Sequence, residues 1–312
     1  MRRALSISDP YDDVVRSLRR LQLFIWIGIV VVWNDRPFGG WLMEKKRIVF
    51  ILGIPRSGTT LVYGMLVRNQ SCIGGSFKES QFYSHILPKP WALETFLTDP
   101  YFTDLLSAEE IREIFLRSDS HLSFFRNAID RFLEREGKCI FVEKSPPHTL
   151  FFRRIIEDFQ HPTIILVERN PAAVVNSIVR TRWSILASDR LPGKLKDVVW
   201  LKYVAAILKY YRYARALEEI RRYPHTISVR YEDIVTGAID LRALLEEELG
   251  VPVDPLYVSR PFSPDVQERN YTLDKRRIEG YRQTMPPSMQ RLVALLFSPN
   301  GRLQTFSSRL LR

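Results

Sequence analysis

The 312-residue chain carries a formal net charge of +11, and 46% of its residues are hydrophobic. This length and apolar content suit one large α/β domain, or such a domain with a terminal appendage, and the absence of internal repeats excludes a repeat protein. The basic excess fits an anionic ligand or an anionic membrane. We expect no nucleic-acid partner, because the sequence has neither zinc-finger spacing nor a sustained Lys/Arg block with interleaved aromatics.

Residues 9–33 are predicted to form one helix, with Asp9 as N-cap and Pro10 as its first residue. Its second half, 23–33, is an unbroken apolar run of eleven residues. That run is shorter than the ~20 residues that a helix needs to cross a bilayer, and no small-residue cleavage site indicates a secretory signal peptide. Two interpretations stay open: the helix packs on the rest of the protein, or residues 10–33 contact a membrane surface as a peripheral anchor.

The segment 34–40 is rich in Pro and Gly, which predicts a boundary after the N-terminal helix. We therefore divide the chain into two parts. Residues 1–40 are predicted to form a hydrophobic helix with its linker, and residues 41–312 a single large domain. The cysteines Cys72 and Cys139 lack the spacing of a metal site. They predict reduced thiols in a cytoplasmic protein, which is membrane-associated if the N-terminal helix is an anchor.

The segment 47–67 combines a strand, a tight turn and a helix in the sequence RIVFILGIPRSGTTLVYGMLV. Its apolar, β-branched start is typical of a buried parallel strand, and helical apolar spacing begins at Thr59. A turn between these elements points several backbone N–H groups and a helix N-terminus at one spot, where phosphate binds. The predicted anion-binding residues are Arg56, Ser57, Gly58, Thr59 and Thr60.

The spacing of this turn is nearly that of the nucleotide-binding P-loop, but Thr59 stands where the P-loop has its lysine. The nearest fixed cation is Arg56, whose planar guanidinium suits an oxyanion. The loop is therefore predicted to bind a nucleotide that has no phosphoryl group to transfer.

The next polar candidates are Lys78 and Glu79, which precede the aromatic pair Phe82 and Tyr83. Aromatic surroundings desolvate a carboxylate, which raises its pKa and makes it a better base near neutral pH. The ammonium of Lys78 opposes that shift. An alternative is that the Lys–Glu pair is an ordinary exposed pair.

Residues 138–142 are predicted as a second buried strand, followed directly by EKSPPH. Ligands gather at the carboxyl ends of parallel strands, so Glu143, Lys144 and His148 fall where chemistry is expected. The ammonium of Lys144 could stabilise negative charge that develops on a leaving group. His148 and Glu143 are rivals of Glu79 for the role of general base.

A third buried strand is predicted at 163–167 and leads into Glu168, Arg169 and Asn170, after which Pro171 begins a helix. Ser177 follows Arg169 by eight residues, which places it about two turns along that helix. A guanidinium and a hydroxyl at the same crevice suit a bidentate phosphate contact with a second donor. Arg180 and Arg182 add positive charge nearby.

The last third of the chain contains fewer candidate functional residues. Residues 200–214 have apolar side chains at helical spacing, Trp200 and Leu208 among them, which predicts a core helix without chemistry. A short strand at 226–229 leads to Tyr231, and a basic segment contains Lys275.

The motifs PRSGTT, KE before two aromatics, EKSPPH and the Arg169–Ser177 spacing occur in an order that resembles the sulfotransferases that use 3′-phosphoadenosine 5′-phosphosulfate (PAPS). The likeness is greatest to the heparan-sulfate and tyrosylprotein enzymes and their bacterial relatives, and it covers residues 47–252. It implies an α/β, three-layer, P-loop-like fold with a mainly parallel central sheet, here with the N-terminal helical appendage.

The same resemblance implies roles for individual residues. Glu79 corresponds to the catalytic base, Lys144 to the cation at the transferring sulfuryl group, and Arg169 with Ser177 to a 3′-phosphate clamp. Tyr231 is implied to lie near the adenosine. Lys275 belongs to the late basic loop of such enzymes, although the usual Arg-Lys-Gly form of that loop is absent.

The implied function is transfer of the sulfuryl group of PAPS to a hydroxyl or amine, without a metal. The acceptor could be a glycan, a glycolipid or lipid, a protein tyrosine or a small metabolite, and the hydrophobic N-terminus favours a carbohydrate or lipid. One alternative is a P-loop small-molecule kinase, which predicts a lysine at Thr59 and a Mg²⁺-binding Asp where Glu168 stands. Another is a non-catalytic, membrane-associated nucleotide-binding protein.

Overall fold

The computed structural model describes residues 47–67, 72–74, 79–181, 199–250 and 276–297, all within the compact unit Lys45–Arg312. The predicted N-terminal helix, Lys78, Arg182 and Lys275 lie outside these residues. The strands are β1 (Arg47–Gly53), β2 (Cys72–Gly74), β3 (Ile140–Lys144), β4 (Thr163–Glu168) and β5 (Thr226–Arg230). They form one sheet in the order β2-β3-β1-β4-β5, and every neighbouring pair is parallel.

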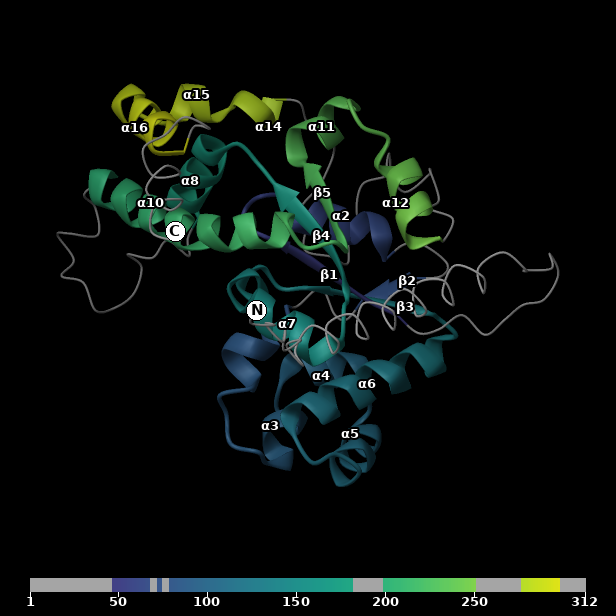
Figure 1. Cartoon of the computed structure of the whole chain (residues 1–312). Helices are drawn as coiled ribbons and strands as arrows, with labels where there is room; N and C mark the ends of the chain where they lie inside the picture. Colours follow the sequence, from purple (N-terminus) through teal and green to yellow (C-terminus); the bar gives the residue numbers. More distant parts are fainter. Residues whose placement is uncertain (1–46, 68–71, 75–78, 182–198, 251–275, 298–312) are drawn as a thin grey trace, which may run out of the picture. The chain divides into compact units, whose positions relative to one another are not determined.

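Helices cover both faces of this sheet (Figure 1). The first half of the chain contributes α2 (Thr59–Leu66), the π-helical turn η1 (Phe82–Ile86), α3 (Leu93–Leu97), α4 (Pro100–Leu105), α5 (Ala108–Leu116), α6 (His121–Glu136), the 3₁₀ turn η2 (Pro146–Phe151) and α7 (Phe152–Phe159). The second half contributes α8 (Pro171–Arg180), α10 (Val199–Arg221), α11 (Tyr231–Thr236), α12 (Leu241–Leu249), α14 (Arg276–Glu279), α15 (Tyr281–Thr284) and α16 (Pro287–Phe297).

Two apolar cores follow from the alternation of side chains along the central strand β1. Phe50 and Leu52 pack in one core with η1, α6, α8 and α10. Val49 and Ile51 point to the other face and pack with α2, α11 and α12. A strand buried on both faces needs a continuous apolar sequence, and the IVFIL segment of β1 provides one. The predicted three-layer α/β fold with a parallel sheet is confirmed.

The strand β3 extends two residues further than the sequence pattern predicts. The apolar run ends at Val142, but pairing with β1 continues, with Phe50 opposite Glu143 and Ile51 opposite Lys144. Glu143 and Lys144 are therefore the last residues of the strand rather than the first of a loop. As successive strand residues, they point to opposite faces of the sheet.

The helix α10 is longer than predicted, and its buried face is different. Tyr203, Ile207 and Tyr210 are buried, whereas Trp200 and Leu208 are 57% and 63% exposed. The prediction that these two residues belong to the core is wrong, because apolar spacing alone does not say which side of a helix meets the sheet.

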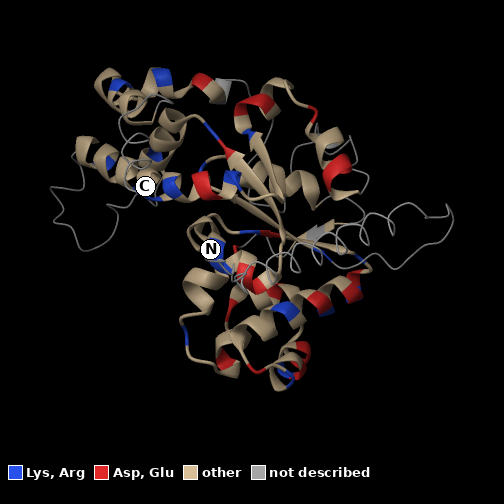
Figure 2. Cartoon of the chain, in the orientation of Figure 1, with Lys and Arg blue, Asp and Glu red and all other residues tan. Residues whose placement is uncertain are grey.

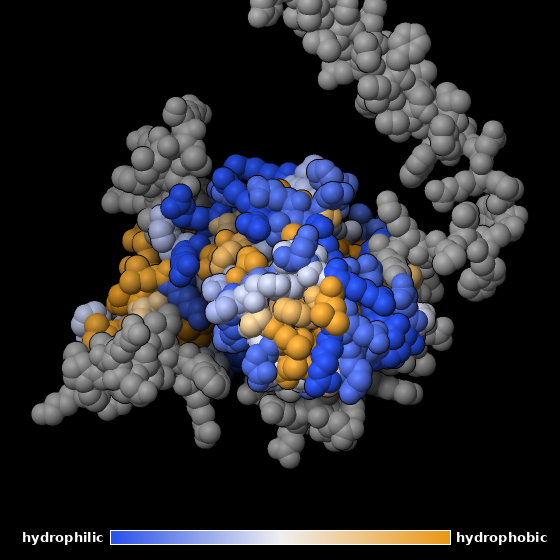
Figure 3. Space-filling view, turned by 90° about the horizontal axis from the view of Figure 1, so that it is seen from below, coloured by the Kyte–Doolittle hydropathy of each residue, from blue (hydrophilic) through white to orange (hydrophobic). Residues whose placement is uncertain are grey.

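Seen from the side of α3 to α6, the surface is mainly hydrophilic and is interrupted by apolar patches (Figure 3).

Charged residues of the sheet lie at the strand ends. Apart from Arg47 at the start of β1, the described strands carry their charges at the carboxyl end, in Glu143, Lys144, Glu168 and Arg230 (Figure 2). In a parallel sheet these ends lie along one edge, which is where ligands bind in open α/β folds. The fold therefore places the loops after β1, β3, β4 and β5 along this one edge of the sheet.

Candidate active site

The turn after β1 depends on Gly58. Its φ of +105° lies in the left-handed region, and a Cβ built on it would lie 2.5 Å from Cδ2 of Tyr231. Any other residue would be strained by the backbone angle and by the contact with the ring. The turn is closed by the N–H of Ser57, which donates to the carbonyl oxygen of Ile54 at 2.9 Å. The loop is thus packed directly against the first residue of α11.

Two hydroxyl side chains of the loop are buried at the start of α2. Ser57 is 1% exposed and Thr59 is 3% exposed. The Ser57 Oγ has no hydrogen-bond partner among the described residues, although such a buried hydroxyl normally has one. The first turn of α2 carries no acidic residue, and no side chain caps it. A phosphate or sulfate group fits this arrangement, because its oxygens can accept from the hydroxyl and from the free N–H groups of the helix start.

Thr149 anchors the loop from the neighbouring strand connection, and the sequence analysis did not single it out. The N–H of Gly53 donates to Thr149 Oγ1 at 2.9 Å, and Thr149 Oγ1 donates to the carbonyl oxygen of Gly53 at the same distance. Thr149 is fully buried in η2. The pair of bonds holds the end of β1 against the EKSPPH turn, and no local sequence signal distinguishes this threonine from an ordinary helix residue.

The structure brings Arg56, Arg169, Ser177 and Tyr231 together. Arg169 Nη1 donates to the carbonyl oxygen of Arg56 at 3.1 Å, and the Arg169 guanidinium carbon lies 4.2 Å from the centre of the Tyr231 ring. Arg56 Nε donates to Ser177 Oγ at 3.1 Å. The loop and the predicted clamp therefore form one cationic, hydroxyl-bearing surface, a chemistry that recognises phosphate.

The neighbours of Arg169 on β4 and α8 have structural partners of their own. Glu168 forms an ion pair with Arg221 of α10. Asn170 caps α8 by accepting from the N–H groups of Ala172 and Ala173, at 2.9 and 3.3 Å. Arg180, at the far end of α8, is exposed. These contacts fix the start of α8 and thereby the point from which the Arg169 side chain leaves the sheet.

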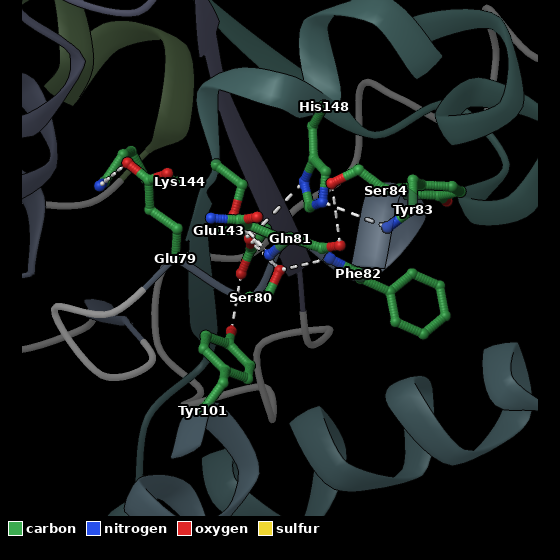
Figure 4. A network of polar contacts seen from close by, with 11 residues as sticks. Glu79, Ser80, Gln81, Phe82, Tyr83, Ser84, Tyr101, Glu143, Lys144 and His148 are labelled. Atoms are coloured by element: carbon green, nitrogen blue, oxygen red, sulfur yellow. Dashed lines mark hydrogen bonds and ion pairs between the residues drawn. The ribbon is translucent and has the colours of Figure 1, made fainter. Parts of the chain in front are cut away.

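The second group in the site joins Lys144 to Glu79. Lys144 Nζ lies 3.0 Å from Glu79 Oε1, and the two side chains are 5% and 32% exposed. The ammonium also lies 5.9 Å from the centre of the Tyr63 ring. A largely buried cation thus contacts a partly exposed carboxylate, and Figure 4 shows the two side chains joined. The two predicted catalytic residues meet although 65 positions separate them in the chain.

His148 and Glu143 lie together on the other side of β3. His148 is fully buried against Phe50 and Tyr83, and burial lowers its pKa to about 3. Its Nε2 accepts a long hydrogen bond, 3.5 Å, from the N–H of Tyr83. Glu143 is 2% exposed, and burial raises its pKa against the opposing effect of hydroxyl donors, of which Ser80 is the strongest.

The fold and this site define an α/β protein with a hydroxyl-bearing loop that suits an anion at the end of β1 and a cation–carboxylate pair at the end of β3. A model described as "Sulfotransferase family" matches residues 49–255, about two-thirds of the chain. The chain therefore belongs to the sulfotransferase family, and it is an enzyme of sulfuryl transfer. This confirms the family predicted from the motifs and argues against the kinase alternative.

Solved sulfotransferase domains from two biosynthetic enzymes share the fold. A sulfotransferase domain from the curacin biosynthetic pathway superposes with a TM-score of 0.58 at 20% identity, covering 83% of this chain and 99% of its own. One from the olefin synthase of Synechococcus PCC 7002 gives 0.56 at 20% identity, with 85% and 98% covered. A mouse sulfotransferase, SULT7A1, complexed with PAP, gives 0.46 at 12% identity, with 86% and 91% covered.

None of the curated proteins matches the chain. Among the described residues, no helix has the length and apolar character required to cross a membrane. The same part of the chain contains no group of three or more His, Cys, Asp or Glu residues that could hold a metal ion.

Proposed function

We propose that this sulfotransferase moves the sulfuryl group of PAPS, in line, onto a hydroxyl or amine of a carbohydrate or lipid, with Glu79 as the general base. The observation that carries this proposal is the 3.0 Å contact between Glu79 Oε1 and Lys144 Nζ at the carboxyl edge of the sheet. It joins a candidate base to a candidate electrophilic cation beside a loop that suits an anion.

PAPS supplies an activated sulfuryl group, and its 3′,5′-bisphosphate product is PAP. The residues that would hold the 5′ end are Ser57, Gly58, Thr59 and Thr60, through hydroxyls and N–H groups. Arg169 and Ser177, joined to the loop through Arg56, would hold the 3′-phosphate, and Tyr231 would lie beside the adenosine. The unpartnered Ser57 hydroxyl and the contact between Arg169 and Arg56 support one ligand that spans both groups.

The proposed step transfers one proton and one sulfuryl group. The Glu79 carboxylate accepts the proton of the acceptor, whose oxygen or nitrogen forms a bond to sulfur. The bond between sulfur and the bridging oxygen breaks, and the phosphate keeps the electron pair. The Lys144 ammonium offsets the charge that develops there, in a largely buried position where such an interaction is strong. Holding both reactants in line supports effective molarities of about 10⁵ M or more.

Exposure favours Glu79 over its rivals for the role of base. His148 and Glu143 are 0% and 2% exposed, so an acceptor could not reach them without a rearrangement of the core. The Glu79 side chain is 32% exposed. A neutral histidine with a pKa of about 3 is also a weak base at neutral pH. We assign His148 and Glu143 to the support of the site.

The acceptor proposal is supported by the apolar run 23–33, which would place the enzyme at a surface where lipids or glycolipids are found. Removal of residues 1–36 is expected to shift the protein from the membrane fraction to the soluble fraction. A control that deletes only residues 1–8 should keep the wild-type distribution. An unchanged distribution of the longer deletion would remove the membrane contact from the proposal.

The reaction is tested by incubating cell extracts with ³⁵S-labelled PAPS and the purified enzyme. We expect label in a carbohydrate or lipid fraction with wild type, and not with Glu79→Gln. The donor is tested separately by thermal shift, where PAP should stabilise the protein and MgATP should not. Label confined to protein or to polar metabolites would overturn the acceptor class, and stabilisation by MgATP alone would overturn the donor.

A further inference from the structure

The buried carboxylate of Glu143 accepts hydrogen bonds from three hydroxyl groups. Ser80 Oγ and Ser145 Oγ donate to Oε1 at 2.6 and 2.8 Å, and the Tyr101 hydroxyl donates to Oε2 at 2.6 Å. Glu143 lies on β3, Ser145 directly after it, Ser80 beside η1 and Tyr101 in α4. We call these four residues the Glu143 network; Figure 4 labels Glu143, Ser80 and Tyr101.

The Glu143 network joins the two chain segments that carry the proposed catalytic pair. Ser80 directly follows Glu79, and Glu143 directly precedes Lys144. Ser145 Oγ also accepts from the N–H of Gln81 at 3.1 Å, which adds a second link between the same segments. Glu79 is thus attached to the end of β3 through the two residues that follow it.

A carboxylate suits this position better than the residues that could replace it. It only accepts hydrogen bonds, and it can accept several at once, so three hydroxyl donors can point at it. An apolar residue would leave those hydroxyls without their partner, and an amide would direct its NH₂ group at some of them. Replacing a buried ionic group by well-packed apolar residues is often neutral or stabilising, so core stability alone gives no reason for a glutamate here.

We propose that Glu143 is a positioning residue, which holds the Glu79 backbone against β3 through Ser80 and Ser145 so that the Glu79 carboxylate meets Lys144. This inference rests on the proposed role of Glu79 as the base. Tyr101 donates to the other carboxylate oxygen and, among the described residues, forms no hydrogen bond with the Glu79 segment, so its hydroxyl supports Glu143 without tying down the base.

The test compares Ser80→Ala with Tyr101→Phe, since each removes one hydroxyl that donates to Glu143 at 2.6 Å. We expect Ser80→Ala to lower kcat about 10- to 100-fold, because small misplacements of a catalytic group have effects of this size. KM for PAPS should change less than about twofold, and Tyr101→Phe should keep kcat within about threefold. Equal losses of kcat in the two variants, or a Ser80→Ala kcat within twofold of wild type, would overturn the proposal.

A readout that needs no acceptor is the rate at which acetic anhydride labels Lys144, followed by mass spectrometry. Ser80→Ala should raise this rate about threefold or more relative to Tyr101→Phe, because Lys144 loses its fixed partner. Equal rates in the two variants count against the proposal. If Ser80→Ala does not fold, Ser145→Ala, which removes the second link, is judged by the same kcat and labelling criteria.

The double variant Ser80→Ala/Glu79→Gln separates this inference from the proposed function. If Ser80 acts through Glu79, adding Ser80→Ala to Glu79→Gln should change the residual rate less than about twofold. If Ser80→Ala lowers the rate of the Glu79→Gln variant by the same factor as it lowers the wild-type rate, the role of Ser80 is merely structural. If Glu79→Gln alone keeps its activity, the base assignment fails, whereas the labelling of Lys144 still decides whether the network sets the geometry of the pair.

Discussion

Arg169 Nη1 donates to the backbone carbonyl oxygen of Arg56 at 3.1 Å, across 113 positions of the chain. The bond ties the residue that follows β4 to the loop that follows β1. Ser177 joins the same group through Arg56 Nε. Two predicted anion-binding features that the sequence places far apart therefore form one surface, and the predictions below test what this surface and the Glu79–Lys144 pair do.

Replacing Arg169 by Gln should weaken binding of PAP, because a charged hydrogen-bonded contact to a phosphate contributes about 2 kcal/mol, or about 30-fold in Kd. Binding of adenosine 5′-phosphosulfate, which lacks the 3′-phosphate, should change less than about threefold. Titration calorimetry measures both. Arg180→Gln is the matched control, since Arg180 is an exposed arginine at the far end of α8. Equal weakening of both ligands would mean that Arg169 does not recognise the 3′-phosphate.

Glu79→Gln should reduce turnover by about 10²-fold or more, as expected for loss of a general base, and leave the Kd for PAP within about threefold. The amide keeps the shape of the side chain but cannot accept a proton. Transfer of ³⁵S to the acceptor fraction and calorimetry with PAP give the two quantities. Glu94→Gln, at an exposed position of α3, should behave like wild type. Activity within a few-fold of wild type would assign the proton transfer to another group.

Gly58→Ala should destabilise the protein more than Gly137→Ala. Both glycines have positive φ, +105° and +62°, but a Cβ at Gly58 meets the Tyr231 ring at 2.5 Å and one at Gly137 meets nothing within 4 Å. We expect about 1 kcal/mol for the backbone angle at Gly137, and about 1–3 kcal/mol more at Gly58 from the steric overlap. Urea unfolding measures the difference. Similar losses at both positions would show that the loop moves away from Tyr231 without resistance.

His148 should make the protein less stable in mild acid. Its pKa of about 3 in the folded protein lies below the ordinary value of 6.5, so the unfolded state binds more protons between these values and stability rises with pH. Between pH 7 and pH 5 the loss should reach about 2 kcal/mol, because the unfolded state binds on average about 0.7 proton more than the folded state over that range. The raised pKa of the nearby Glu143 acts in the opposite direction, so the comparison must be made between variants.

Urea unfolding of His148→Gln at both pH values isolates this contribution. The variant should lose about 2 kcal/mol less than wild type on going from pH 7 to pH 5, whatever its stability at pH 7. His85→Gln, which changes an exposed histidine of η1, should keep the wild-type dependence. A His148→Gln profile parallel to that of wild type would mean that the buried histidine does not titrate on unfolding as described.

Much of the fold could be read from local patterns. The apolar runs IVFIL and TIILV predict strands buried on both faces, because a parallel strand between helical layers needs apolar residues at every position. The turn residues from Gly53 to Gly58 predict the loop, because only glycine tolerates the φ of +105° found at Gly58. The motifs and their order were enough to predict the family, which the family model confirms.

The residues that hold the site in place could not be predicted from local sequence patterns. Thr149, Ser80 and Tyr101 carry no signal in the sequence, and each matters through a contact with a residue more than 40 positions away. The sequence pattern ends β3 two residues early, because it stops where the apolar residues stop, whereas strand pairing with β1 continues through Glu143 and Lys144.

The sequence by itself determined which chemical groups this sulfotransferase has and the order in which they occur, since the turn, the strands and the charged residues at the strand ends follow from local composition. Only the tertiary structure decided which of these groups meet. The order β2-β3-β1-β4-β5 brings Arg169 to the loop and Lys144 to Glu79, and the alternation along β3 buries Glu143 and leaves Lys144 with Glu79. Strand order and register are properties of the whole sheet, so no single segment of the chain contains them.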